Sequence, residues 1–159
     1  MSSRRRILLF AGTLLLVAGW YFFRPERAVL DREVAEAAPT DAASKVAQGD
    51  FESRAHDTRG SVRVLELADG SRVLRLENFE TSDGPDLQVY LLVSPDVSNG
   101  AQLNEAGFVS LGPLKGNIGE QNYVIPGGVD LTRYRAVSIW CRRFGVNFAT
   151  ARLLPSDRT

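Results

Sequence analysis

The sequence contains a single cysteine, Cys141, a single histidine, His56, and no methionine besides Met1. A lone cysteine cannot form a disulfide bond within the chain. Zinc–thiolate sites, blue-copper sites and haem sites with two protein ligands need more sulfur or imidazole groups than these three residues supply. We therefore expect no cofactor bound through these side chains, and carboxylates are the only remaining metal ligands within one chain.

The chain also lacks an excess of either charge, with 19 basic and 19 acidic residues. Seven of the basic and five of the acidic residues precede Asp50, so the remainder of the chain is mildly acidic. Proteins that bind a phosphate backbone present a basic face. The charge distribution therefore argues against a nucleic-acid partner.

One long apolar run is present, near the N-terminus. Residues 7–23 contain no charged side chain, follow a basic segment at residues 1–6, and end in four aromatic residues, 20–23. A run of this length is near the lower limit for crossing a bilayer. Aromatic residues gather at membrane–water interfaces, which matches the end of this run.

Three interpretations of this run are open: a cleaved signal peptide, a soluble core helix and an uncleaved membrane anchor. A signal peptide needs small residues just after its apolar core, whereas bulky aromatic residues end this run. A continuous apolar stretch behind a basic cluster is unusual for a soluble helix. We predict a transmembrane helix over residues 7–23, with residues 1–6 in the cytoplasm and the rest of this single-pass protein outside it, in the periplasm or at the cell surface.

Residues 24–48 are rich in Ala, Glu, Asp, Arg and Ser and lack a substantial apolar face. We predict that they form a linker. From Asp50 onward, the apolar residues recur with a period of two. An Asp-Gly dipeptide at 69–70 separates two such segments, which predicts a hairpin with a two-residue turn and places Leu65 opposite Leu74.

Further strand segments follow at residues 87–93, 108–111, 122–126, 134–141 and 146–154, and Pro and Gly residues separate them. No long helical pattern is present outside the N-terminal run. We predict an all-β domain over residues 49–155, an antiparallel β-sandwich or barrel of about seven or eight strands.

Cys141 is the one residue able to perform sulfur chemistry. Alternation along residues 134–141 places it on one face of a strand with Val137 and Ile139, whereas Trp140 lies on the other face. Most free cysteines are small buried apolar residues. The alternative is a reactive thiolate supported by the adjacent basic pair, Arg142 and Arg143. Without a second cysteine, its redox chemistry would be intermolecular: a mixed disulfide, a homodimer bridge through Cys141, or reversible oxidation.

Other candidate sites are weaker. The glycine-rich segment 112–119 lacks the Gly-Lys-Ser/Thr ending of a phosphate loop, so we interpret its glycines as turn residues. Asp83 and Asp86 share a turn, but two carboxylates are far fewer than the roughly six oxygens that Ca²⁺ prefers. His56 has no nearby nucleophile or acid that would indicate a catalytic triad. The sequence therefore predicts neither a metal site nor an enzyme.

Several short motifs occur together between residues 49 and 154. They are residues 49–51 (GDF), His56 with Gly60, 76–79 (LENF), 84–87 (GPDL), 89–91 (VYL), 111–117 (LGPLKGN), Gly119, 121–123 (QNY), 125–126 (IP), 139–141 (IWC), Phe144, 148–149 (FA) and Ala151. In these motifs the region resembles the electron-transfer DM-thirteen domain family. The resemblance implies an extracytoplasmic β-domain, often attached to membranes or to other modules. It also implies a redox or electron-transfer role for the family's cysteine, which corresponds to Cys141 with Trp140 beside it.

Two functional hypotheses follow. The first is a membrane-anchored extracytoplasmic interaction module that is linked to redox or electron transfer through Cys141, supported by Trp140, Arg142 and Arg143. Its partners would be the membrane and an unidentified envelope protein or redox partner. The second is a structural or adhesive module that binds protein or ligand, in which Cys141 only packs in the core.

Overall fold

The computed structural model describes residues 10, 12–17, 19, 21 and 31–156. The chain divides into two units, Met1–Leu30 and Asp31–Thr159. In the first unit the described residues are helical. Much of the predicted membrane anchor, residues 7–23, lies outside the described residues, and among those described no helix is long and apolar enough to cross a membrane.

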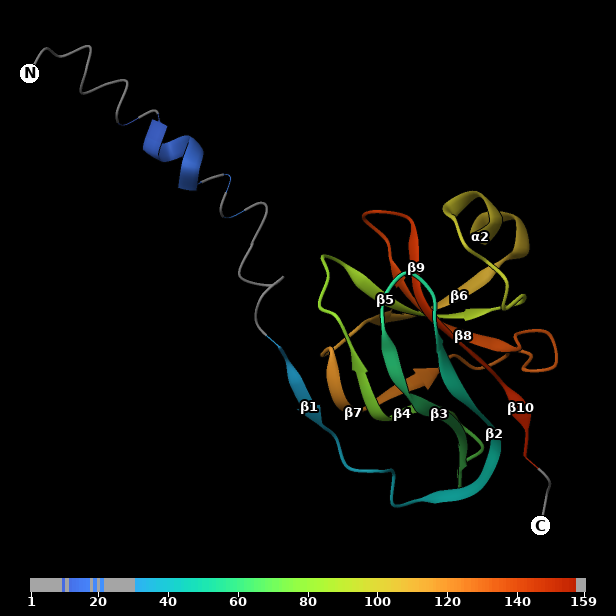
Figure 1. The fold of residues 1–159 in the computed structure, drawn as a ribbon. Coiled ribbons are helices and arrows are strands. Elements are labelled where there is room, and N and C mark those ends of the chain that lie inside the picture. Colours follow the sequence, from blue (N-terminus) through green and yellow to red (C-terminus); the bar gives the residue numbers. More distant parts are fainter. Residues whose placement is uncertain (1–9, 11, 18, 20, 22–30, 157–159) are drawn as a thin grey trace, which may run out of the picture. The chain divides into compact units, whose positions relative to one another are not determined.

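The second unit is built mostly of strands (Figure 1). In chain order its elements are β1 (Glu33–Ala35), β2 (Ala42–Ser53), β3 (Thr58–Leu67), β4 (Arg72–Thr81), β5 (Leu87–Leu92), α2 (Gly100–Ala106), β6 (Phe108–Pro113), β7 (Ile118–Ile125), β8 (Ala136–Cys141), β9 (Val146–Arg152) and β10 (Leu154–Pro155). The domain was predicted to be all-β; it is mostly β, and α2 adds a short helix. The described residues form ten strands rather than seven or eight, because β1, β10 and most of β2 fall in segments that lack strong alternation.

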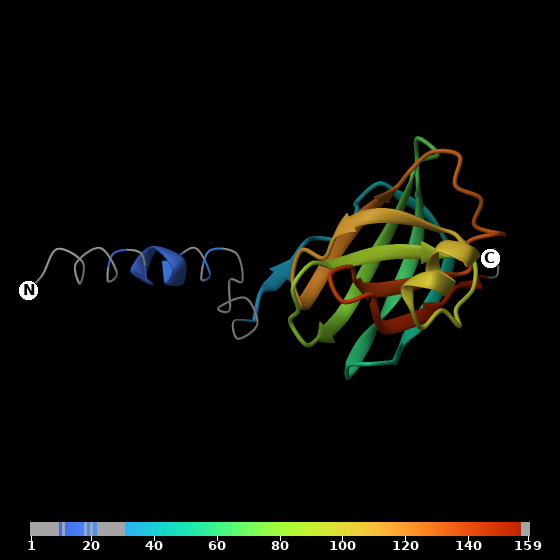
Figure 2. The ribbon, with the colours of Figure 1, turned by 90° about the horizontal axis from the view of Figure 1, so that it is seen from above.

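All ten strands belong to one sheet, in the order β1-β7-β4-β3-β2-β9-β8-β5-β6, with β10 paired to β2. Neighbouring strands are antiparallel except β1 and β7, which run parallel. The sheet curls around its core as a half-barrel, as the view from above shows (Figure 2). Of the two predicted architectures, a sandwich or a barrel, the single curled sheet is nearer to the barrel, although it forms only half of one.

The long strand β2 makes the curl possible. Its residues from Ala42 to Asp50 pair with β3, whereas Phe51–Ser53 pair with β9. Gly49 lies near the end of the part that pairs with β3, opposite Val62, and a side chain at this position would collide with the carbonyl oxygen of Arg152. The glycine therefore lets the two halves of the sheet approach each other where β2 changes partners.

Apolar side chains fill the inside of the curl, among them Val62, Val64, Leu74, Leu76, Phe79, Val89, Leu91, Val137, Ile139, Cys141 and Phe148. A second, smaller cluster lies on the other face of β5 and β8 and includes Leu103 of α2. Because apolar residues cover both faces, every residue of β5 and β8 is buried.

The predicted hairpin exists as β3 and β4, but its register was predicted wrongly. Leu65 pairs with Val73, and Val64 pairs with Leu74. The connection spans residues 68–71 rather than two residues, because Leu67 and Ser71 close it with a hydrogen bond of 2.8 Å. A shift of one residue moves side chains to the opposite face, so the core receives Val64 instead of Leu65.

The predicted linker, residues 24–48, is also corrected. Residues 24–30 lie outside the described residues, whereas β1 and the start of β2 place residues 31–48 in the folded unit. β1 was missed because it has three residues and is held mainly by polar contacts from β7. Gly116 and Gly119 allow this segment to approach, since a side chain at Gly116 would collide with the Arg32 carbonyl oxygen and one at Gly119 with the Val34 carbonyl oxygen.

Candidate functional site

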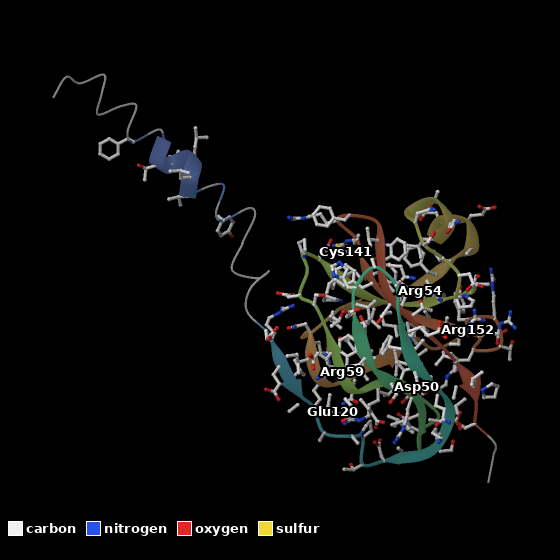
Figure 3. The ribbon with its side chains drawn as sticks, viewed as in Figure 1. Asp50, Arg54, Arg59, Glu120, Cys141 and Arg152 are labelled. Carbon is white, nitrogen blue, oxygen red and sulfur yellow. The ribbon has the colours of Figure 1, made fainter. Side chains whose placement is uncertain are left out.

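Cys141 ends β8 and is fully buried in the main core (Figure 3). Its neighbours across the sheet are Leu87 on β5 and Val146 on β9. Its Sγ donates a hydrogen bond to the carbonyl oxygen of Pro85 at 3.2 Å. The thiol therefore lies beneath residues 82–86, which connect β4 to β5 and which we name the cover turn.

The cover turn fits closely against the core. A side chain at Gly84 would place its Cβ 3.0 Å from the ring of Phe148, so a larger residue would have to displace that ring slightly. Asp86 adopts a left-handed backbone conformation with φ +66°, which aspartate tolerates better than most residues. The turn is thus shaped by its own sequence to lie over Cys141.

Arg142 holds the C-terminal end of the cover turn. Its Nε donates to Asp86 Oδ2 at 2.8 Å, its guanidinium also donates to Oδ1 at 3.1 Å, and its backbone N–H donates to the Asp86 carbonyl at 3.1 Å. The hydrogen bond to the Asp86 carboxylate, together with its charge, raises the pKa of Arg142. Arg142 therefore remains a cation that is committed to Asp86.

Two further contacts hold the N-terminal end of the cover turn. The Arg32 guanidinium lies 3.8 Å from Asp83 Oδ1. The ring of His56 stacks on Phe148 with centroids 3.7 Å apart, and its Nδ1 lies 3.0 Å from the hydroxyl oxygen of Ser82. The sequence indicated no role for His56, because both partners come from distant segments of the chain.

Asp83 is the buried carboxylate of the site. Its side chain is 4% exposed, and Oδ1 accepts a hydrogen bond from the Gly84 backbone N–H at 2.8 Å. Oδ2 is buried and has no hydrogen-bond partner among the described residues. The sequence showed only that Asp83 and Asp86 share a turn, and burial of the Asp83 carboxylate could not be predicted from it.

The four residues singled out from the sequence do not converge. Trp140 is buried on the opposite face of β8 from Cys141, in the second cluster near Leu103 of α2. Arg143 is exposed in the turn between β8 and β9. Within the described part of the chain, no hydrogen bond or ion pair joins Arg142 or Arg143 to the thiol. The sulfur instead contacts the carbonyl oxygen of Pro85, an acceptor that only a protonated thiol can bind.

The remaining candidates take structural roles. The carboxylates of Asp83 and Asp86 have separate partners, and the described residues contain no cluster of three or more potential metal ligands. Gly112 and Gly119 have φ values of +115° and +102°, but they lie inside β6 and β7, next to irregularities in the strand pairing, rather than in turns as predicted.

A family model described as Electron transfer DM13 matches residues 50–153. The match includes the cover turn, His56 and Cys141, and it leaves β1 and the first part of β2 outside. No curated protein and no solved structure matches the chain.

Proposed function

The chain belongs to the Electron transfer DM13 family, and on this premise we propose that it is a membrane-tethered, redox-related interaction module outside the cytoplasm in which Cys141 is the redox thiol. The apolar composition of residues 7–23 supports the tether. The single observation that supports the role of Cys141 is its position directly beneath the cover turn, where its S–H group donates a hydrogen bond to the carbonyl oxygen of Pro85.

In this proposal the thiol is unreactive while the cover turn is closed. The nucleophile in thiol chemistry is the thiolate, and a buried S–H bound to a carbonyl is both protonated and inaccessible. The Arg142 side chain is 65% exposed, and an exposed ion pair contributes only about 0–1 kcal/mol. The contact that closes the turn is therefore weak enough for local opening without unfolding of the sheet.

The partner that we propose is a protein of the cell envelope that carries a disulfide bond. After the turn opens, Cys141 loses its proton, and its sulfur bonds to one sulfur of that disulfide while the S–S bond breaks. The second sulfur leaves as a thiolate and takes up a proton from the solvent. The product is a mixed disulfide between the two proteins, and no external oxidant or reductant is required.

A second function is favoured by the complete burial of Cys141 among apolar core residues. In that case the domain is a structural or ligand-binding module, and the sulfur only packs. The two functions differ in one measurable respect. A gated thiol reacts through local opening, whereas a core thiol reacts only when the whole domain unfolds.

Thiol labelling of the full chain in lipid nanodiscs tests this difference. For a gated thiol, the labelling rate of the wild type is slow and insensitive to urea below the unfolding transition, because local opening exposes little surface. Arg142→Gln should raise this rate by up to about fivefold, the effect of losing an exposed ion pair. The control is Arg152→Gln, which removes another exposed ion pair, that with Asp96, and should leave the rate unchanged.

A labelling rate that follows global unfolding in all three proteins would overturn the redox role and support the packing role. The partner is tested by non-reducing electrophoresis of intact membranes. A mixed-disulfide band present in the wild type and absent in Cys141→Ser supports a partner protein, whereas a band of twice the chain mass indicates a homodimer through Cys141 instead. The tether is tested by alkaline carbonate extraction, where release of the chain from membranes would contradict it.

A further inference from the structure

The segment that follows the N-terminal unit contacts the cover turn. Its first described residues are Asp31 and Arg32, immediately before β1. The Arg32 guanidinium lies 3.8 Å from the buried carboxylate of Asp83. The site around Cys141 is therefore completed by a residue that lies outside the range matched by the family model.

Asn117 joins the same segment to the start of the cover turn. Its side chain accepts a hydrogen bond from the Arg32 backbone N–H at 2.7 Å and donates to Asp31 Oδ1 at 2.8 Å. It also donates to the carbonyl oxygen of Thr81, the last residue of β4, at 3.1 Å. Asn117 is 1% exposed, so these bonds form inside the protein and couple the position of Arg32 to that of the turn.

Asp83 depends on Arg32 for its countercharge. A buried carboxylate is strongly unfavourable unless it is paired and hydrogen-bonded. Asp83 receives one hydrogen bond, from Gly84, and one of its oxygens has no partner. Within the described part of the chain, Arg32 is the one cation within 4 Å of this carboxylate.

The segment is attached in a way that permits release. β1 has three residues and pairs with one neighbour, β7, at the edge of the sheet (Figure 1). Polar contacts attach Glu36, the residue that follows β1. Glu36 accepts from Lys115 Nζ at 2.7 Å and from the Asn122 N–H at 2.7 Å, and its carbonyl accepts from Arg75 at 3.0 Å. Water can replace each of these partners when the strand leaves.

We propose that docking of residues 31–36 controls access to Cys141, with Arg32 as a positioning residue that keeps the cover turn closed. While the segment is docked, Arg32 neutralises Asp83 and the turn covers the thiol. When the segment leaves β7, Asp83 becomes a buried carboxylate without a countercharge. Movement of Asp83 into water removes the cost of burying an unpaired carboxylate. The same movement carries the cover turn away from Cys141.

This inference rests on the proposed gated thiol, and it couples that thiol to the chain segment leading from the N-terminal unit. The test compares the thiol-labelling rates of full-length Arg32→Gln, Arg32→Gln/Asp83→Asn and the wild type in nanodiscs. Arg32→Gln should label about tenfold faster below the unfolding transition, because it leaves a buried charge unpaired. The double variant should label close to the wild-type rate, because the charge that needed Arg32 is gone.

The control is Arg59→Gln, which removes an exposed ion pair with Glu80 and should not change labelling. Hydrogen exchange of the Gly84 amide provides a second readout and should rise in Arg32→Gln together with the labelling rate. Faster labelling in both Arg32→Gln and the double variant would indicate general destabilisation and overturn the inference. If Arg142→Gln raises the labelling rate and Arg32→Gln does not, the role of residues 31–36 is contradicted, while the proposal that Cys141 is a gated thiol is supported. If neither variant is labelled below the unfolding transition, the proposal that Cys141 is a gated thiol is itself contradicted.

Discussion

The thiol of Cys141 and the carbonyl oxygen of Pro85 lie 3.2 Å apart, although 56 residues separate them in the sequence. The contact ties the end of β8 to the connection between β4 and β5. Only the protonated thiol can donate this hydrogen bond. Because this contact is buried, it contributes to the stability of the folded domain whether or not the thiol also reacts.

Replacement of Cys141 by alanine should therefore destabilise the domain. Cys141→Ala removes a buried sulfur and leaves the Pro85 carbonyl without its donor, which we expect to lower the free energy of unfolding by about 1–2 kcal/mol. Urea denaturation monitored by tryptophan fluorescence measures the loss. Arg143→Ala, in the exposed turn beside it, should change stability by less than about 0.5 kcal/mol. An unchanged urea midpoint in Cys141→Ala would show that the sulfur does not pack as the structure has it.

Arg75 is the most buried cation of the domain's described part, with 6% exposure. Its guanidinium lies 2.6 Å from Glu120 and 3.2 Å from Glu77, and it also donates to Asn122 Oδ1 and to the Glu36 carbonyl. Arg75→Met leaves Glu120 without its cation and removes the donor to Asn122 and to the Glu36 carbonyl, whereas Glu77 keeps its ion pair with Arg63 at 2.9 Å. We expect a loss of about 3 kcal/mol in the free energy of unfolding.

The matched control for Arg75→Met is Arg59→Met. Arg59 also lies in this part of the sheet and pairs with Glu80, but both side chains are exposed. An exposed pair contributes at most about 1 kcal/mol. Equal losses in the two variants, measured by urea denaturation, would contradict the burial of the Arg75 network.

The lowered pKa of Glu36 predicts that the domain loses stability in acid. Burial acts to raise the pKa of Glu36, but the hydrogen bonds from Lys115 and from the Asn122 N–H outweigh it and hold the pKa below its ordinary value of 4.5. A carboxyl whose pKa is lower in the folded state stabilises folding above its unfolded pKa, and this contribution disappears as pH falls through the folded value. The stability difference between wild type and Glu36→Gln should be constant from pH 7 to about 5 and shrink below pH 4.5. A difference independent of pH would contradict the assignment.

The raised pKa of Tyr123 predicts that the domain loses stability in alkali. Burial raises the pKa of Tyr123 from 10.0 to about 12, although a backbone hydrogen bond from Lys115 partly opposes the change. The unfolded chain therefore ionises first, so this contribution to stability is complete below pH 10.0 and is lost as pH rises toward 12. The slope should approach about 1.4 kcal/mol per pH unit in this range. Tyr123→Phe should remove this component, whereas Tyr134→Phe, at a more exposed tyrosine, should retain it.

Most strands could be predicted from local patterns. The alternation around Cys141 placed it correctly on the face of Val137 and Ile139, with Trp140 opposite, because side-chain direction in a strand depends only on position. The hairpin at residues 69–70 was located correctly as well. Its register was not, because the closing bond between Leu67 and Ser71 depends on how the whole loop folds.

The surroundings of the candidate site could not be predicted in the same way. The proximity of Arg142 to Cys141 in the sequence suggested support for a thiolate, yet its guanidinium binds Asp86 instead. The contact between Arg32 and Asp83 joins segments about 50 residues apart, and β1 itself has too few apolar residues to show a pattern. Each of these contacts requires the curled sheet to bring distant segments together.

By itself, the sequence determined that this chain has one thiol, that no internal disulfide can form, and that the thiol lies on an apolar strand face. These conclusions depend on residue counts and on alternation, which are local properties. Only the tertiary structure decided that this thiol is covered by residues 82–86 and donates a hydrogen bond to the carbonyl oxygen of Pro85. It also decided that Arg32 and Arg142 hold the cover turn in place. The reason is physical: the reactivity of Cys141 depends on burial and on hydrogen-bond partners, and both are supplied by segments that become neighbours only when the chain folds.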